Sequence, residues 1–249
     1  MKKLAVYLVL LSALLAVLAG CSGQRAIAWK EPVVEQAVRE YLGRPEGAVY
    51  PEDLEGIWWI TFVGDRCFIN QPADVRTFSV RTGSAVLNVD TGASRTEQGD
   101  SPSSMATLED FAHFPGLDRL ELYDMSLSRL EGVEKLAENP RLRELTLSFG
   151  SKLTTLEGLG QLRQLTKLRL VGLPVSDLSQ LEHLTFLTML NIEDLPLGGL
   201  SFFEGLESLE ELYVYNVAPA DWAPALRCRK LAKYDIQHTD GTLLSNVKD

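Results

Sequence analysis

The sequence predicts an α/β solenoid with a parallel β-sheet on its concave face and short 3₁₀ or α turns on its convex face. The pattern L-x-x-L-x-L, with conservative replacements, occurs six times between residues 117 and 236, and the last four intervals are 23, 22, 22 and 22 residues. Apolar residues three positions apart precede most copies, a spacing that suits a 3₁₀ or short α turn. Because a unit of this length buries its apolar face only against a neighbouring unit, the copies are expected to stack.

Residues 1–20 are expected to form a secretory signal peptide. Lys2 and Lys3 precede an almost wholly apolar run over residues 4–18, followed by small residues. The alternative is a permanent transmembrane helix, but this run is shorter than the about 20 apolar residues that span a bilayer.

The end of this segment suggests a lipid anchor. The sequence Leu18-Ala19-Gly20-Cys21 resembles the bacterial lipobox, and that resemblance implies that cleavage leaves Cys21 as a lipidated N-terminus. Residues 21–32 would then be a tether, and the protein would be exported and held in the bacterial cell envelope. Whether the anchoring membrane is an inner membrane, an outer membrane or a Gram-positive surface stays open.

The chain is acidic. Its formal net charge is -10, and removal of Lys2 and Lys3 with the signal peptide makes it -12. Nucleic acid and anionic membrane surfaces require a basic footprint, so neither is an expected partner surface. The same acidity also fits simple colloidal solubility.

Residues 33–56 are expected to form a helical cap over the open end of the first coil. Apolar residues at positions 34, 38, 41 and 42 have helical period, and Gly43 is a suitable helix stop.

Residues 57–106 are expected to hold a first coil and an insertion. Ile57, Ile60 and Phe62 fit the strand pattern of the later repeats. Residues 75–80 and 85–89 are β-prone segments around a turn signal, which indicates either a β-hairpin or a distorted coil. From Thr91 to Ser104 the chain is rich in Gly, Ser, Thr, Pro and charge, and such a composition is typical of a polar loop.

Residues 107–238 carry the regular repeats, and residues 239–249 are expected to be a C-terminal tail. The six-fold pattern resembles the bacterial leucine-rich repeats of the internalin-like, 22-residue class, and the segment over residues 33–54 is similar to the helical cap that precedes such repeats. That family usually has asparagine three residues after the sixth-position leucine. This chain instead has Met125, Gly150, Leu173, Leu195 and Val217 there, which predicts less regular bends.

The outward strand positions three, five and seven of each repeat are where binding residues are expected, because they form columns on the concave face. The third-position column alternates in charge and is typical of a solvated charge ladder. One cluster differs, because exposed aromatic side chains beside apolar and amide groups indicate an interface. The proposed ligand-binding residues are Tyr213, Tyr215, Met189, Asn191, Val171 and Arg169.

No enzymatic or metal motif accompanies these columns. His113, His183 and His238 lie in different repeats, and no paired Cys-x-x-Cys, Gly-x-Ser-x-Gly or phosphate-binding glycine loop occurs. Cys67 and Cys228 are expected to lie at least five coils apart, which is too far for a disulfide. The sequence therefore predicts no enzyme activity, no metal and no cofactor.

The predicted function is that of a lipid-anchored binding protein that recognises a protein or glycan through its concave face. The alternative is a non-catalytic structural or assembly factor of the cell envelope.

Overall fold

The computed structural model describes residues 25–64, 66–70, 77–82, 85–90, 104–218 and 220–247. The predicted signal peptide, Cys21 and most of the predicted polar loop lie outside the described residues. Within the described ranges, no helix is long and apolar enough to cross a membrane.

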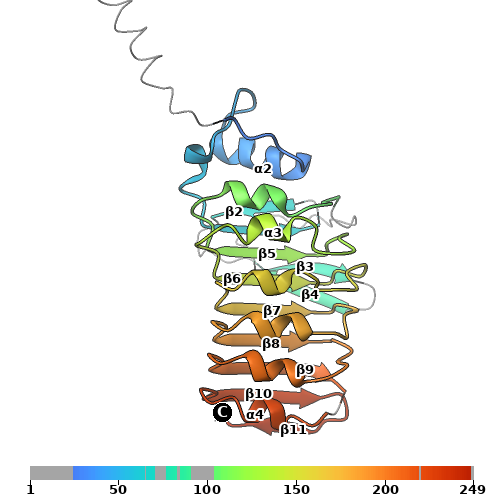
Figure 1. The fold of residues 1–249 in the computed structure, drawn as a ribbon. Coiled ribbons are helices and arrows are strands. Elements are labelled where there is room, and N and C mark those ends of the chain that lie inside the picture. The colour runs from blue at the N-terminus through green and yellow to red at the C-terminus, as the bar shows by residue number, and fades with distance from the viewer. Residues whose placement is uncertain are drawn as a thin grey trace, which may run out of the picture.

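Nine strands of the described chain form one sheet, in the order β11-β10-β9-β8-β7-β6-β5-β1-β2 (Figure 1). The parallel strands are β1 (Trp59–Val63), β5 (Arg119–Tyr123), β6 (Glu144–Ser148), β7 (Lys167–Val171), β8 (Met189–Glu193), β9 (Glu211–Val217) and β10 (Lys233–His238). Two antiparallel strands close the ends, β2 (Arg66–Ile69) beside β1 and β11 (Leu243–Ser245) beside β10. The predicted fold class, a leucine-rich repeat solenoid with its sheet on the concave face, is confirmed.

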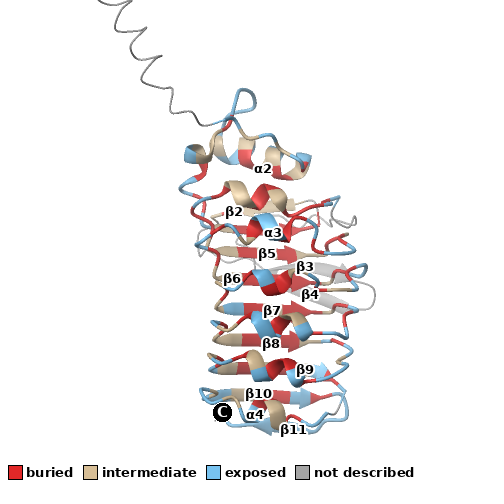
Figure 2. Cartoon of the chain, viewed as in Figure 1, coloured by how far each residue is buried: buried red, intermediate tan, exposed pale blue. Residues whose placement is uncertain are grey.

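The leucines of the repeat hold the coils in register. Leu120, Leu145 and Leu168 are paired partners in β5, β6 and β7, and each is at most 3% exposed. The same column continues through Leu190 and Leu212, both fully buried. Figure 2 shows buried residues in every coil, so one apolar core runs along the stack.

Short helical turns form the opposite face, as the three-residue spacing predicts. They are η2 (Glu109–His113), α3 (Val133–Leu136), η3 (Leu159–Gln161), η4 (Ser179–His183), η5 (Ser201–Gly205) and α4 (Ala223–Leu226). Leu159 and Leu181 point inward from η3 and η4 and are fully buried.

The bends after the strands are regular, so the expectation of irregular bends is wrong. A residue with a left-handed backbone directly follows each of β1 and β5 to β8; these residues are Gly64, Asp124, Phe149, Gly172 and Asp194. Asn216 has the same conformation at the corresponding position of β9, one residue before the strand ends. The amide of Asp124 donates to the carbonyl of Ser148, 2.9 Å away, and the amide of Phe149 donates to that of Val171, 2.8 Å away. Backbone groups of neighbouring coils thus bond to one another where an asparagine side chain would otherwise satisfy them.

Helix α2 (Pro32–Leu42) lies at the N-terminal end and packs against β2. It ends at Gly43, whose φ of 62° is the left-handed conformation that favours glycine at this position. The turn η1 (Pro51–Leu54) follows and leads into β1. Val34 and Val38 of the helix are buried in the core that continues into the coils.

The insertion contains a hairpin, which decides between the two forms that the sequence left open. Strands β3 (Thr77–Thr82) and β4 (Ala85–Asp90) pair antiparallel in a separate two-stranded sheet. The edge strands β2 and β11 were not expected, because neither carries the repeat pattern. Residues 239–249, expected to be a tail, contribute β11 to the sheet.

Candidate binding face

The concave face of the sheet presents three columns of outward side chains. In the fifth-position column, strand pairing places Thr61, Glu121, Thr146, Arg169, Asn191, Tyr213 and Asp235 side by side along the stack. The parallel register therefore brings together residues that lie about 22 positions apart in the sequence, as the repeat predicts.

Tyr213 and Tyr215 lie on β9 with their hydroxyl groups already engaged. The Tyr213 hydroxyl donates to Oε2 of Glu211 at 2.7 Å, and the Tyr215 hydroxyl donates to Oδ2 of Asp235 at 3.2 Å. Lys233 Nζ stands 5.1 Å from the centre of the Tyr213 ring, a cation–π distance. Burial and the nearby Asp235 carboxylate raise the pKa of Tyr215. Both rings are half-buried and held in place by neighbouring coils.

Met189, Asn191 and Arg169 lie next to these tyrosines. Asn191 is the register partner of Tyr213 on one side and of Arg169 on the other, while Met189 pairs with Glu211. Arg169 Nη2 reaches Oε2 of Glu193 at 3.5 Å. The buried Asn191 Oδ1 and Arg169 Nε have no hydrogen-bond partner in the part of the chain that the structure describes. Five of the six proposed residues therefore lie on the three adjacent strands β7, β8 and β9 and are at least partly accessible.

Val171 differs from the other proposed residues. It occupies an outward position of β7, as expected, but only 1% of its surface is exposed. The expectation that Val171 forms part of an accessible patch is wrong, because its side chain is buried. Strand alternation shows which side a residue faces, and it does not show whether other chain segments lie over that side.

The third-position column behaves as the predicted charge ladder. Glu144 pairs with Arg119 on one side at 2.6 Å and with Lys167 on the other at 2.7 Å. At this exposure such pairs contribute on the order of 0–1 kcal/mol each. These charges neutralise one another and leave the tyrosine cluster as the more distinctive part of the face.

A second aromatic group stands at the N-terminal end of the concave face. Trp59 Nε1 donates to Oε2 of Glu121 at 3.2 Å, and Thr61 Oγ1 donates to the same oxygen at 2.8 Å. The Arg119 guanidinium lies 5.3 Å from the centre of the Trp59 ring. Trp58, the preceding residue, is 47% exposed.

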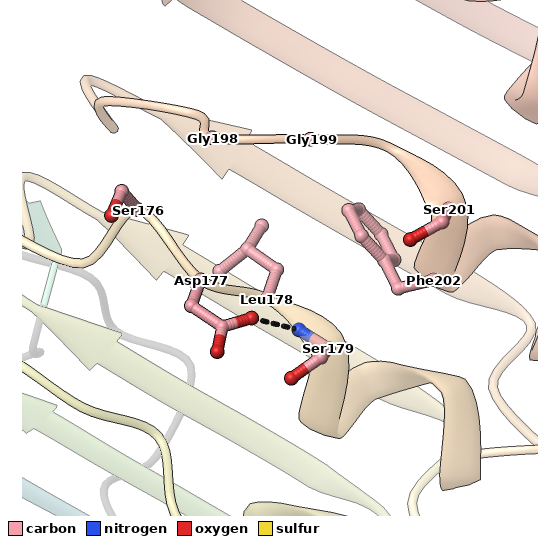
Figure 3. A pocket seen from close by; sticks show the side chains of 8 residues that line it. All are labelled: Ser176, Asp177, Leu178, Ser179, Gly198, Gly199, Ser201 and Phe202. Carbon is pink, nitrogen blue, oxygen red and sulfur yellow. Dashed lines mark hydrogen bonds between the residues drawn. The ribbon is translucent and has the colours of Figure 1, made fainter.

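A shallow hollow between two coils lies away from the tyrosines, and no sequence motif indicated it (Figure 3). Its volume is about 250 Å³, and it is lined by Ser176, Asp177, Leu178, Ser179, Gly198, Gly199, Ser201 and Phe202. Asp177 Oδ1 accepts a hydrogen bond from the Ser179 amide at 2.8 Å, and this bond lowers the pKa of the carboxyl group. The carboxylate that lines the hollow therefore accepts a hydrogen bond from the first residue of η4.

The titratable groups of the described residues elsewhere are buried, paired or scattered. Among the described residues, no group of three or more His, Cys, Asp or Glu side chains is placed to hold a metal ion. His238 is buried and its Nε2 accepts a hydrogen bond from Trp222 Nε1 at 2.6 Å. Cys67 and Cys228 are free thiols, and burial raises the pKa of both, which makes them poorer nucleophiles.

No protein-family model and no curated protein matches this sequence. Among solved structures, the chain is similar to internalin C2 from Listeria monocytogenes, with 16% identity and a TM-score of 0.47 over 86% of this chain and 100% of that chain. A second internalin from that species, inlF, is 15% identical with a TM-score of 0.40, over 84% of this chain and 71% of the other. A leucine-rich repeat protein of Leptospira interrogans is 20% identical with a TM-score of 0.44, over 52% and 33% of the two chains. The fold assignment rests on this chain's own strand register and buried leucines.

Proposed function

We propose that this protein is a non-catalytic binding protein that recognises a protein partner through the concave face of coils β8 to β10. The observation that carries the proposal is the tyrosine cluster, in which Tyr213 and Tyr215 stand beside Met189 and Asn191 on adjacent strands. Aromatic side chains with neighbouring apolar and amide groups are enriched where protein interfaces concentrate their binding free energy.

The hydrogen bonds within the cluster support binding over chemistry. The tyrosine hydroxyls are held by Glu211 and Asp235, so the rings are oriented before a partner arrives. Pre-oriented side chains lose less conformational entropy on binding. The same bonds engage the two carboxylates, which argues against a role as free general acids or bases.

A protein fits this surface better than a glycan, the other partner class that the sequence left open. The cluster combines Met189, two tyrosines and the acidic residues Glu193, Glu211 and Asp235 on one face. An apolar and aromatic centre with a charged rim is the usual anatomy of a protein–protein interface.

Replacing Tyr213, Tyr215 and Met189 together by alanine tests the proposal. Each side chain of a binding centre contributes on the order of 2 kcal/mol, so the triple variant should lose at least about 30-fold in affinity for a co-purified partner. The matched control is Phe186→Ala, because Phe186 is 63% exposed but lies in the turn before β8, outside the concave columns. Equal capture by the triple variant and by the natural protein would contradict the proposal.

The lipid anchor at Cys21 is part of the same proposal, and the lipobox-like sequence Leu18-Ala19-Gly20-Cys21 supports it. Replacement Cys21→Ser should move the protein from the membrane fraction to the soluble fraction. A Cys228→Ser variant is the control and should stay with the membrane. Continued membrane association of the Cys21 variant would count against the anchor, whatever the binding experiment shows.

A further inference from the structure

One apolar column of the core ends on a partly exposed leucine at the C-terminal end of the stack. The sixth-position residues of the parallel strands are register partners and each is at most 1% exposed; they are Phe62, Leu122, Leu147, Leu170, Ile192, Val214 and Ile236. Leu244 of β11 is the next register partner in this column, and it is 37% exposed. Water therefore reaches the column at its last member.

Other core positions of the last coil are exposed in the same way. Leu231 and Tyr234 are half-buried, although Leu209 and Leu212, at the same positions of the preceding repeat, are fully buried. Figure 1 places α4, β10 and β11 together at this end of the stack. Large apolar side chains of α4, of β11 and of the residues after it are exposed; they are Leu226, Leu243, Leu244 and Val247. Apolar side chains gathered at one end of a domain indicate a contact surface.

The N-terminal end of the same core is covered, which makes the two ends of the stack different. Helix α2 packs against β2, and its Val34 and Val38 are at most 1% exposed. Among the described residues, β11 is the last strand of the sheet, and all three of its residues are exposed. Because stacked repeats need a cap at each end, the C-terminal end of the described chain requires a further cover.

The backbone of β11 directs hydrogen-bonding groups to its outer edge. The Asn246 amide donates to the carbonyl of Tyr234 at 3.1 Å, so Asn246 faces β10. Because alternate residues of an antiparallel strand turn their backbone groups to opposite sides, Leu244 also faces β10. By the same alternation, Leu243 and Ser245 turn their N–H and C=O groups outward, and such an edge is a template for another strand.

A second copy of the chain matches this edge at all three strand positions. Two identical strands pair antiparallel about a two-fold axis, and an axis at Leu244 places Leu243 of one copy opposite Ser245 of the other. Each of these two pairs then exchanges two hydrogen bonds. The two Leu244 residues meet at the axis as a non-hydrogen-bonded pair, with Cα atoms about 4.5 Å apart. The apolar column of one copy therefore continues into that of the other.

We propose that two copies of this chain associate edge to edge through β11, with a two-fold axis at Leu244. The two sheets then form one continuous sheet, and each copy covers the exposed core of the other. A second copy is favoured over an unrelated strand because it supplies both outward pairs and the apolar residue on the core side. The inference concerns this edge and does not depend on what the concave face binds.

Oxidative cross-linking of Leu244→Cys tests the position of the axis. The protein used is residues 21–249 with Cys21→Ser, which removes the proposed anchor as a cause of association. We expect a disulfide-linked dimer, because the two Cα atoms lie within the about 7 Å that a disulfide requires. Peptide mass distinguishes this bond from any bond of Cys67 or Cys228.

Gln237→Cys is the matched control, because position 237 is also exposed but lies on β10. In the proposed pair, the two β10 strands are three strand spacings apart, about 14 Å, which is too far for a disulfide. We therefore expect no dimer from this variant. Equal cross-linking at the two positions, or none at position 244, would overturn the inference.

Sedimentation velocity measures the association without a cross-link. We expect the dimer fraction to rise with protein concentration, and Leu244→Lys to raise the dissociation constant at least about tenfold, because two like charges then meet at the axis. Phe186→Lys is the control, since Phe186 is 63% exposed but lies in the turn before β8, and it should dimerise as the natural chain does. A natural chain that stays monomeric up to about 0.2 mM, or equal dissociation constants for the two variants, would overturn the inference. If Leu244→Lys fails to fold, as judged by its far-ultraviolet spectrum, the cross-linking result and the natural chain decide.

Discussion

At the scale of single residues, two buried carboxylates fasten the N-terminal segment to the first full coil. Asp110 is 1% exposed and accepts hydrogen bonds from the amides of Lys30, at 3.1 Å, and Glu31, at 2.8 Å. Glu31 is 4% exposed and accepts from the amides of Ala106 and Thr107, at 2.9 and 2.7 Å. The Glu31 side chain thus accepts from amides close to Asp110, and the Asp110 side chain accepts from amides at Glu31 and its neighbour. These bonds hold the N-terminal segment against the start of the first full coil.

Replacing Asp110 by asparagine should destabilise the fold. Asparagine keeps one oxygen that can accept from both amides, because the Lys30 amide also reaches Oδ2, but its NH₂ group then faces the Lys30 amide and the negative charge of the acceptor is lost. Such a loss costs about 1–3 kcal/mol in the free energy of unfolding, measured by urea titration. Asp118→Asn, at a half-buried position before β5, is the control and should change little. A loss no larger than that of the control would show that the carboxylate contacts are dispensable.

Asp53 should make stability depend weakly on acidic pH. The neighbouring Arg44 guanidinium and the Tyr50 amide hold the pKa of this carboxyl group below its ordinary value. Because its pKa is lower in the folded state, ionised Asp53 adds to the free energy of unfolding at pH values above its unfolded-state pKa of about 3.9. This stabilisation is lost as the pH falls through the folded-state pKa. Because the pair is partly exposed, the contribution should be under about 1 kcal/mol.

The measurement is urea unfolding of the natural protein and Asp53→Asn at neutral pH and at pH values below 4. The difference between the two should shrink as the pH falls. A difference that grows in acid would contradict the assigned sign.

At the scale of secondary-structure elements, close stacking of the convex turns requires a residue without a side chain. In η5, a Cβ at Gly205 would collide with the backbone carbonyl oxygen of Glu182 in η4. Gly199 lies a few residues earlier in the same coil, and a Cβ there meets nothing within 4 Å. The two glycines thus differ in their contacts with the neighbouring coil.

Gly205→Ala should therefore be costly and Gly199→Ala nearly neutral. Forcing a methyl group against fixed backbone costs about 1–3 kcal/mol or more, because the two coils must separate. Thermal unfolding of both variants measures the difference. Similar melting temperatures for the two variants would mean that the coils adjust to the added methyl group.

The sequence predicted the repeated elements well and the irregular ones poorly, for physical reasons. Leu145 and Leu168 repeat at a fixed interval, so their burial and register follow from periodicity alone. Asp124, Asp194 and the residues at the equivalent positions adopt left-handed backbone conformations, which give the bends a common form. The absence of the family's asparagines did not indicate this conformation. Strands β2 and β11 pair at the sheet ends without the repeat pattern, so no period marks them.

At the scale of the whole molecule, the same limit applies to the concave face. Column membership was predictable, and Tyr213, Asn191 and Arg169 lie side by side as the repeat requires. The exposure of the side chains in a column was not predictable, because Val171 and Ser148 are each 1% exposed although the repeat places them at outward positions. The proposed binding surface is therefore centred on β8 to β10, where the outward side chains are at least partly exposed.

The central claim is that this open surface, and not the convex turns, contacts the partner. Site-specific photo-crosslinking in the native host tests it, with the photoreactive residue at Gln237, which is exposed beside Tyr215, or at Phe186 as the control. The account predicts a discrete cross-linked product from position 237 that disappears when Tyr213 and Tyr215 are changed to alanine, and none from position 186. The same product from both positions, or a product from position 186 alone, would contradict it.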